Sequence, residues 1–132
     1  MLMMAQTAAV SKKALWTGRI VSGWIVLFLL FDGAVKVMKL APAMEGTARL
    51  GYPLSLVVPI GIVELLCVVA YVIPRTSMLG AILLTGYLGG ATATQVRLED
   101  PWFVFPIAVG VLVWVGLLLR DERLRAVIRS RR

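Results

Sequence analysis

Four long apolar segments restrict the fold of this chain more than any other feature of its sequence. They cover residues 18–38, 54–73, 78–96 and 102–119. Each has about 20 residues, the length of α-helix that crosses a hydrocarbon core of roughly 30 Å. Helices are expected because backbone polar groups in lipid must find their hydrogen-bond partners within the chain. The pattern predicts an all-α integral membrane protein, a multi-pass antiparallel four-helix bundle.

The composition agrees with a single membrane domain over residues 1–132. Of these residues 60% are hydrophobic, and the mean hydropathy is +0.90. A soluble domain has a much smaller apolar share, so lipid must solvate the excess. The net charge of +7 does not indicate nucleic-acid binding, because the basic residues lie at the ends of the apolar segments. That placement is typical of membrane topology.

The positions of lysine and arginine predict the orientation. Lys12, Lys13 and Arg19 lie at the start of the first segment, Arg75 lies between the second and the third, and residues 120–132 are rich in arginine. Basic residues concentrate on the cytoplasmic side. We therefore expect both termini in the cytoplasm, with residues 120–132 as a basic tail near anionic lipid headgroups.

The connections and the tail carry further signals. Pro42 predicts the start of a short helix in the first external connection, and Gly51 predicts its end. Residues 73–77 form a tight connection, so the second and third segments should be antiparallel neighbours. In the tail, Leu124 and Ile128 have helical spacing, which predicts that the tail continues the fourth helix.

Several kinds of chemistry are excluded by residue content. Histidine is absent, and Cys67 is the only cysteine. A His-ligated haem, an intrachain disulfide and a His- or multi-Cys-ligated zinc site within one chain are therefore impossible. No metal-ligand cluster, phosphate-binding loop or nucleophile–base pair is present. We do not expect the chain to be catalytic on its own, and we interpret Cys67 as an inert buried thiol.

Three ionisable residues inside the apolar segments are the best indication of function. Asp32 and Lys36 lie one helical turn apart near the end of the first segment, and Glu64 lies near the middle of the second. A charged side chain at the bilayer centre costs roughly 2.5–3.5 kcal/mol on insertion scales, so it needs a partner or a function. The predicted depths place Lys36 within reach of both acids. We therefore expect one shared polar cluster, which is either a structural clasp or a ligand or proton site.

The third segment contributes polar and small residues near this cluster. Tyr87 and Gln95 are candidates to line the same cavity as Glu64. Gly86 and Gly90 form a small-xxx-small pair of the kind that packs helices in membranes. Gly61, about one turn before Glu64, is a further candidate for close helix packing.

Several short motifs follow one another along the chain: FDGAVKVM at 31–38, LGYP at 50–53, GIVELL at 61–66, IPRT at 73–76, LGAILL at 79–84, GA at 90–91 and LRD at 119–121. In their order and spacing, more than in any single one of them, they resemble the DoxX-like family of small membrane proteins, and the similarity spans residues 18–124. The resemblance implies a four-helix bundle in the bacterial inner membrane, with Lys36 and Glu64 at positions that usually carry Lys and Glu.

The resemblance also favours a function. Some relatives are subunits of a thiosulfate:quinone oxidoreductase, which suggests a quinone as ligand and membrane oxidoreductase subunits as partners. Distant relatives use cysteine pairs for disulfide chemistry, which a lone Cys67 cannot perform. The leading hypothesis is an accessory subunit of a membrane redox complex that binds a lipid or quinone through Asp32, Lys36 and Glu64. One alternative is a small proton-coupled transporter, because four-helix exporters also carry a membrane-embedded Glu and act as homo-oligomers. The other is a membrane assembly factor that docks a partner through Gly86 and Gly90.

Overall fold

The computed structural model describes residues 2–130, with side chains described for residues 12–128. The all-α prediction is confirmed, because every regular element in the described part of the chain is helical. Short 3-10 turns at Leu54–Leu56, Pro74–Thr76 and Pro101–Phe103 precede three of the helices. The α-helices are α1 (Leu2–Val37), α2 (Ala41–Arg49), α3 (Val57–Val72), α4 (Ser77–Arg97), α5 (Val104–Arg120) and α6 (Glu122–Ser130).

Three helical stretches of the described chain are long and apolar enough to cross a membrane. They are Lys12–Val37, Leu54–Val72 and Pro101–Arg120. The sequence predicted four. The remaining segment forms α4, which has 21 residues, but its glycines, threonines and Gln95 leave it less apolar than the other three. By length and composition, the chain is a helical membrane protein.

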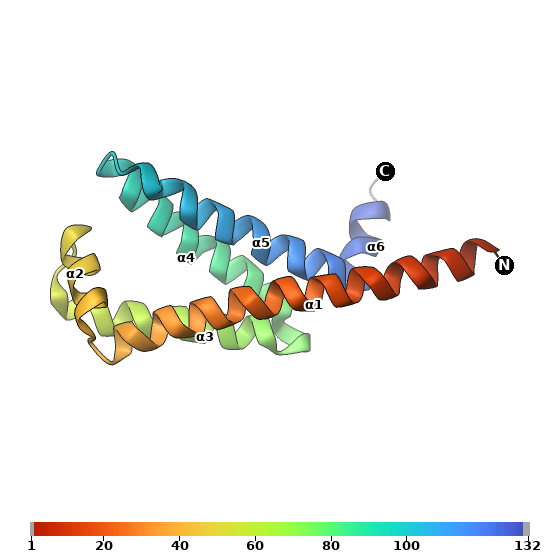
Figure 1. The fold of residues 1–132 in the computed structure, drawn as a ribbon, viewed down its shortest axis with the longest axis horizontal. Helices are drawn as coiled ribbons and strands as arrows, with labels where there is room; N and C mark the ends of the chain where they lie inside the picture. Colours follow the sequence, from red (N-terminus) through yellow and green to blue (C-terminus); the bar gives the residue numbers. More distant parts are fainter. Residues whose placement is uncertain (1, 131–132) are drawn as a thin grey trace.

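Each of the four long helices packs against two of the others. Helix α1 packs against α3 and α5, and α4 also packs against α3 and α5. In Figure 1, α1 runs beside α3 and α4 runs beside α5, and the two pairs spread apart toward the end where α2 lies. The start of α1 and the helix α6 both lie toward the opposite end, where α1 extends beyond α6. Both ends of the described chain are therefore on the same side of the molecule.

The core contains buried apolar side chains from all four long helices, including Leu29, Leu84 and Val113. Tyr71 is fully buried among them, and its hydroxyl donates to the Val113 carbonyl at 2.7 Å. The guanidinium of Arg120 lies 4.8 Å from the centroid of the Tyr71 ring. A buried polar group is tolerated when it is hydrogen-bonded, so Tyr71 ties α3 to α5 within the apolar core.

Two connections differ in how well the sequence predicted them. Pro42 lies in the first turn of α2, and Gly51 follows that helix with a φ of 87°, so the short helix expected there is present. The tail, however, does not continue α5. The backbone of Asp121 is extended, and its Oδ1 accepts hydrogen bonds from the amides of Arg123 and Leu124. Asp121 thereby caps a new helix, α6. Arg131 and Arg132 of the predicted tail lie outside the described residues.

The predicted packing glycines separate into two groups. A Cβ at Gly61 would lie 2.8 Å from the Cβ of Lys36 and 3.0 Å from the Gly33 carbonyl oxygen, so Gly61 allows α3 to approach α1 beside Lys36. A Cβ at Gly86 or Gly90 would meet no atom within 4 Å. These two glycines do not pack helices within the described chain, because no other helix lies against their side of α4.

Candidate functional site

Lys36, in the last turn of α1, lies at the centre of the polar cluster. Its ammonium donates to Asp32 Oδ2 at 2.6 Å, to Tyr87 Oη at 2.7 Å and to Glu64 Oε1 at 3.1 Å. The Lys36 side chain is 19% exposed. An ammonium has three hydrogens to donate, and all three are directed at oxygen atoms. Lys36 is therefore the shared counter-charge for both acids.

Glu64 is the most deeply buried member of the cluster, with 1% of its surface exposed. Its Oε1 accepts from Lys36 and, at 3.2 Å, from the hydroxyl of Tyr87. Its Oε2 is buried and has no partner among the described residues. A buried acceptor without a partner costs about 1–3 kcal/mol. One oxygen of Glu64 is thus hydrogen-bonded in the structure, and the other is buried without a partner among the described residues.

Each cluster residue is positioned by regular helix geometry. Asp32 precedes Lys36 by one turn of α1, in the favourable acid-before-base order. Glu64 faces this turn because Gly61, nearly one turn earlier in α3, lets the two helices approach closely. Tyr87 reaches the cluster from α4. Three helices therefore supply the four side chains.

A cavity of about 150 Å³ adjoins the cluster. This volume matches that of an apolar cavity that accommodates a benzene ring. All five residues that the sequence proposed as ligand-binding candidates line it: Asp32, Lys36, Glu64, Tyr87 and Gln95.

Gln95 stands in the cavity wall without bonding to the cluster. It lies in α4 about two turns beyond Tyr87, and its Oε1 is buried with no partner among the described residues. Its neighbour Thr94 points elsewhere, because the Thr94 hydroxyl pairs with the hydroxyl of Tyr52 at 2.7 Å. Two of the residues that line the cavity, Gln95 and Glu64, therefore each have a buried oxygen without a partner in the described chain.

The remaining cavity walls are apolar and were not identified from the sequence. Phe28 of α1 and Phe105 of α5 both line the cavity and form an edge-to-face pair with ring centroids 5.4 Å apart. Leu88 and Pro106 form another part of the wall. Aromatic residues in an apolar run resemble ordinary lipid-facing residues, so nothing in the sequence marked Phe28 or Phe105 as part of a site.

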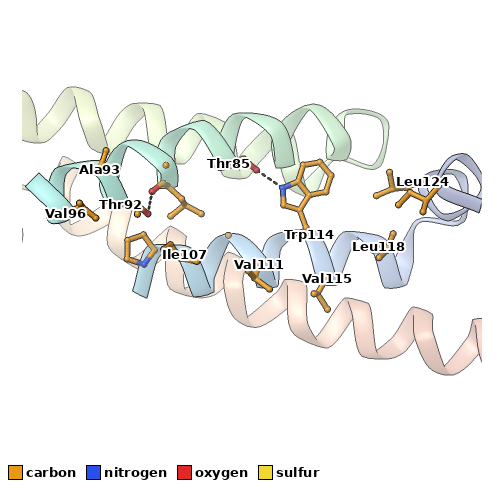
Figure 2. Close-up of a pocket in the computed structure, with 15 residues that line it drawn as sticks. Thr85, Thr92, Ala93, Val96, Ile107, Val111, Trp114, Val115, Leu118 and Leu124 are labelled. Atoms are coloured by element: carbon orange, nitrogen blue, oxygen red, sulfur yellow. Dashed lines mark hydrogen bonds between the residues drawn. The ribbon is translucent and has the colours of Figure 1, made fainter. Parts of the chain in front are cut away.

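A larger apolar groove lies between α4 and α5 (Figure 2). Its volume is about 790 Å³, and Leu88 and Pro106 belong to its wall as well as to that of the small cavity. Trp114 stands over one part of the groove, with its indole N–H donating to the Thr85 hydroxyl at 2.6 Å. Leu124 of α6 closes one end of it. The small cavity and the apolar groove thus share two wall residues, Leu88 and Pro106.

The fold and the site together define a helical membrane protein with an ion-paired cluster shared by three helices. The chain belongs to the DoxX-like family, whose model matches residues 20–116. No curated protein and no solved structure matches the chain. The matched region includes all five cavity residues proposed from the sequence, so the whole site lies within the family domain.

Proposed function

We propose that this protein is a non-catalytic accessory subunit of a membrane redox complex, and that it binds a lipid-like molecule such as a quinone. The observation that carries the proposal is a ring-sized cavity lined by the ion-paired cluster, in which Glu64 is buried with its Oε2 unpartnered among the described residues. Ionisable residues within a membrane domain are expected to face its interior and to mark functional sites.

The head of such a ligand would lie beside Lys36, Glu64 and Gln95. Small-molecule sites are typically apolar with a few polar groups that fix orientation. Here Phe28 and Phe105 supply apolar walls, and the cluster supplies the polar side. A six-membered ring is the largest head that a volume of about 150 Å³ favours.

The tail of the ligand would occupy the groove between α4 and α5. This groove is almost entirely apolar and shares Leu88 and Pro106 with the small cavity. A polar ring with a long apolar chain, which is the general form of a quinone lipid, would fill both spaces at once. A small water-soluble ligand would leave the groove unused.

The proposal includes a placement in the cell. The protein would be a four-helix bundle in the bacterial inner membrane, with α4 as the fourth span and both termini in the cytoplasm. Helix α6 would then lie near anionic headgroups, because Arg123 and Arg125 alternate with apolar residues along it. Subunits of a membrane oxidoreductase would be the partners.

Extraction and mass spectrometry of the purified protein test this function. We expect a quinone or related lipid to co-purify with the wild-type chain and to be depleted at least severalfold in Glu64→Gln. Glu45→Gln is the matched control, because Glu45 is an exposed residue of α2 outside the cavity. Absence of any bound lipid, together with unchanged binding in Glu64→Gln, would contradict the proposal.

A proton-coupled transporter is the second candidate, and the charge balance of the cluster favours it. Asp32 and Glu64 are two carboxylates against the single ammonium of Lys36. The surplus acid could take up and release a proton while a cation enters the cavity. Proteoliposomes that contain the protein would then accumulate ethidium when a pH gradient is applied, and Glu64→Gln would abolish the flux. No gradient-driven flux of ethidium or other cations would exclude this candidate.

A further inference from the structure

Leu88 of α4 stands between the two spaces that the proposed ligand would occupy. It lines both the small cavity and the apolar groove, and only 7% of its surface is exposed. Pro106 of α5 is the other residue that the two walls share. The ring of a proline is bonded to its own backbone, so Pro106 cannot turn aside. A passage between the cavity and the groove therefore depends on the position of the Leu88 side chain.

The Leu88 side chain has room to move on the groove side. Gly110 of α5 lies opposite it, and a Cβ at Gly110 would be 3.8 Å from Leu88 Cδ1, so the glycine leaves the place of a side chain open. Gly110 lines the groove and not the small cavity. On the cavity side, by contrast, Leu29 and Val109 are buried in the same packed core as Leu88. A leucine in a helix can change its χ1 rotamer, and the open direction for Leu88 is toward Gly110.

We propose that Leu88 determines which chain the ligand can carry. Its side chain closes the small cavity against the groove, and it turns toward Gly110 to admit a ring that bears a long apolar chain. The inference rests on the proposed function, since it concerns the same ligand site. A ring with a short substituent fits the cavity with Leu88 in place. A ring with a long chain displaces Leu88, because the chain must pass between Leu88 and Pro106 to reach the groove.

The size of the side chain at position 88 should therefore set the preference between long and short chains. Leu88→Ala opens the passage, so a long chain enters without displacing a side chain. Leu88→Phe fills the passage with a larger side chain, which makes displacement harder. Gly110→Ala adds a methyl group where Leu88 would turn, yet at 3.8 Å this group makes only an ordinary contact with Leu88 in its present position.

Two probes with the same ring separate these effects: 2-methyl-1,4-benzoquinone and 2-decyl-1,4-benzoquinone. Each is added to the full chain in detergent, and the bound probe is counted by native mass spectrometry. Benzoquinones alkylate thiols, so all measurements use a Cys67→Ala background, and the denatured intact mass checks that no adduct has formed. The ratio of decyl to methyl probe bound should rise severalfold in Leu88→Ala and fall severalfold in Leu88→Phe and Gly110→Ala.

Two control variants match these changes at positions that line neither space. Leu84→Ala makes the same truncation one turn earlier in α4, at a fully buried residue. Gly23→Ala adds a methyl group to α1 where a Cβ meets no atom within 4 Å. Both should leave the ratio of the two probes unchanged. Gly110→Ala also guards against misfolding in the larger substitution, because alanine is favoured over glycine in a helix.

The outcomes separate this inference from the proposed function. Opposite changes of the ratio in Leu88→Ala and Leu88→Phe, with a decrease in Gly110→Ala, would support the inference. Binding of both probes with a ratio that no variant changes would overturn it and leave the proposed ligand site intact. An equal rise in Leu84→Ala and Leu88→Ala would overturn it as well, because general loosening of α4 would then explain the effect. Binding of neither probe to the unaltered site would overturn both the inference and the proposed function.

Discussion

Glu64 and Lys36 are joined through a single carboxylate oxygen. Oε1 of Glu64 lies 3.1 Å from the ammonium nitrogen of Lys36, whereas Oε2 has no partner among the described residues. The salt bridge therefore compensates the charge of Glu64 without using all of its hydrogen-bonding capacity. The contribution of this pair to stability and its proposed contribution to ligand binding can therefore be tested with different variants.

Replacement of Lys36 by Met should destabilise the fold strongly. It removes the ammonium that contacts both Asp32 and Glu64. Loss of one partner of a buried ion pair typically costs about 3–5 kcal/mol. Thermal unfolding in detergent, followed by circular dichroism, would show a lower midpoint. Adding Glu64→Gln should recover part of the loss, because it removes the unpaired buried charge.

Lys39→Met is the control for this variant. Lys39 is exposed and lies just beyond the end of α1, so its replacement should change stability by less than about 0.5 kcal/mol. Similar midpoints for Lys36→Met and Lys39→Met would show that the cluster does not contribute to stability.

Tyr87→Phe should weaken the cluster while keeping its packing. The hydroxyl that is lost accepts from Lys36 at 2.7 Å and donates to Glu64 at 3.2 Å. Hydrogen bonds to charged groups contribute about 1.5–3 kcal/mol. Tyr52→Phe is the comparison variant, because it removes a hydroxyl that pairs with the neutral hydroxyl of Thr94 rather than with charged groups. Denaturant titration should rank Tyr87→Phe as the more destabilising change, and the reverse order would contradict the assignment.

Gly80→Ala and Gly86→Ala should have opposite effects on stability. A Cβ at Gly80 would overlap the backbone of Tyr71, where α3 and α4 meet, whereas one at Gly86 would meet nothing within 4 Å. Overpacking typically costs about 1–3 kcal/mol. Alanine in an open helical position is favoured over glycine by up to about 1 kcal/mol. Unfolding midpoints that move in the same direction in both variants would contradict this packing.

Gly89→Leu should reduce the lipid that co-purifies with the protein. Gly89 lines the apolar groove, and a Cβ there meets no atom within 4 Å, so a larger side chain can fill the groove without disturbing the helices. Gly86→Leu adds the same side chain to the same helix outside the groove. Quantitative lipid mass spectrometry should show a severalfold loss only in Gly89→Leu. Equal lipid content in the two variants would show that the groove does not hold the tail.

The helices and the charge cluster could be predicted from the sequence for physical reasons. Spacing within one helix fixed the pairing of Asp32 with Lys36, and membrane depth limited which acid on another helix could reach the same ammonium. Local turn residues predicted α2, since Pro42 and Gly51 act on the backbone within a few residues. Each of these arguments needs only the rise of a helix or the conformation of one residue.

Helix contacts were less predictable because they depend on rotation about the helix axes. Gly86 and Gly90 have the spacing of a packing motif, yet their side of α4 is open. Gly18 and Gly116 were not predicted to pack helices, yet a Cβ at Gly18 would lie 2.8 Å from the Gly116 carbonyl oxygen. The break at Asp121 was missed for a related reason. The spacing of apolar residues continues across it, and only the cap that Asp121 forms shows where the helix stops.

The pairing of Lys36 with Asp32 has a consequence for biosynthesis. Chains are made from the N-terminus, and these two residues lie in the same helix. Helix α1 can therefore enter the membrane with its ammonium already neutralised. When α3 follows, Glu64 meets a counter-ion that is already in place, and Tyr87 of α4 joins last. Apart from the one surplus carboxylate, each charge that enters the membrane has its partner in the same helix or in a helix inserted earlier.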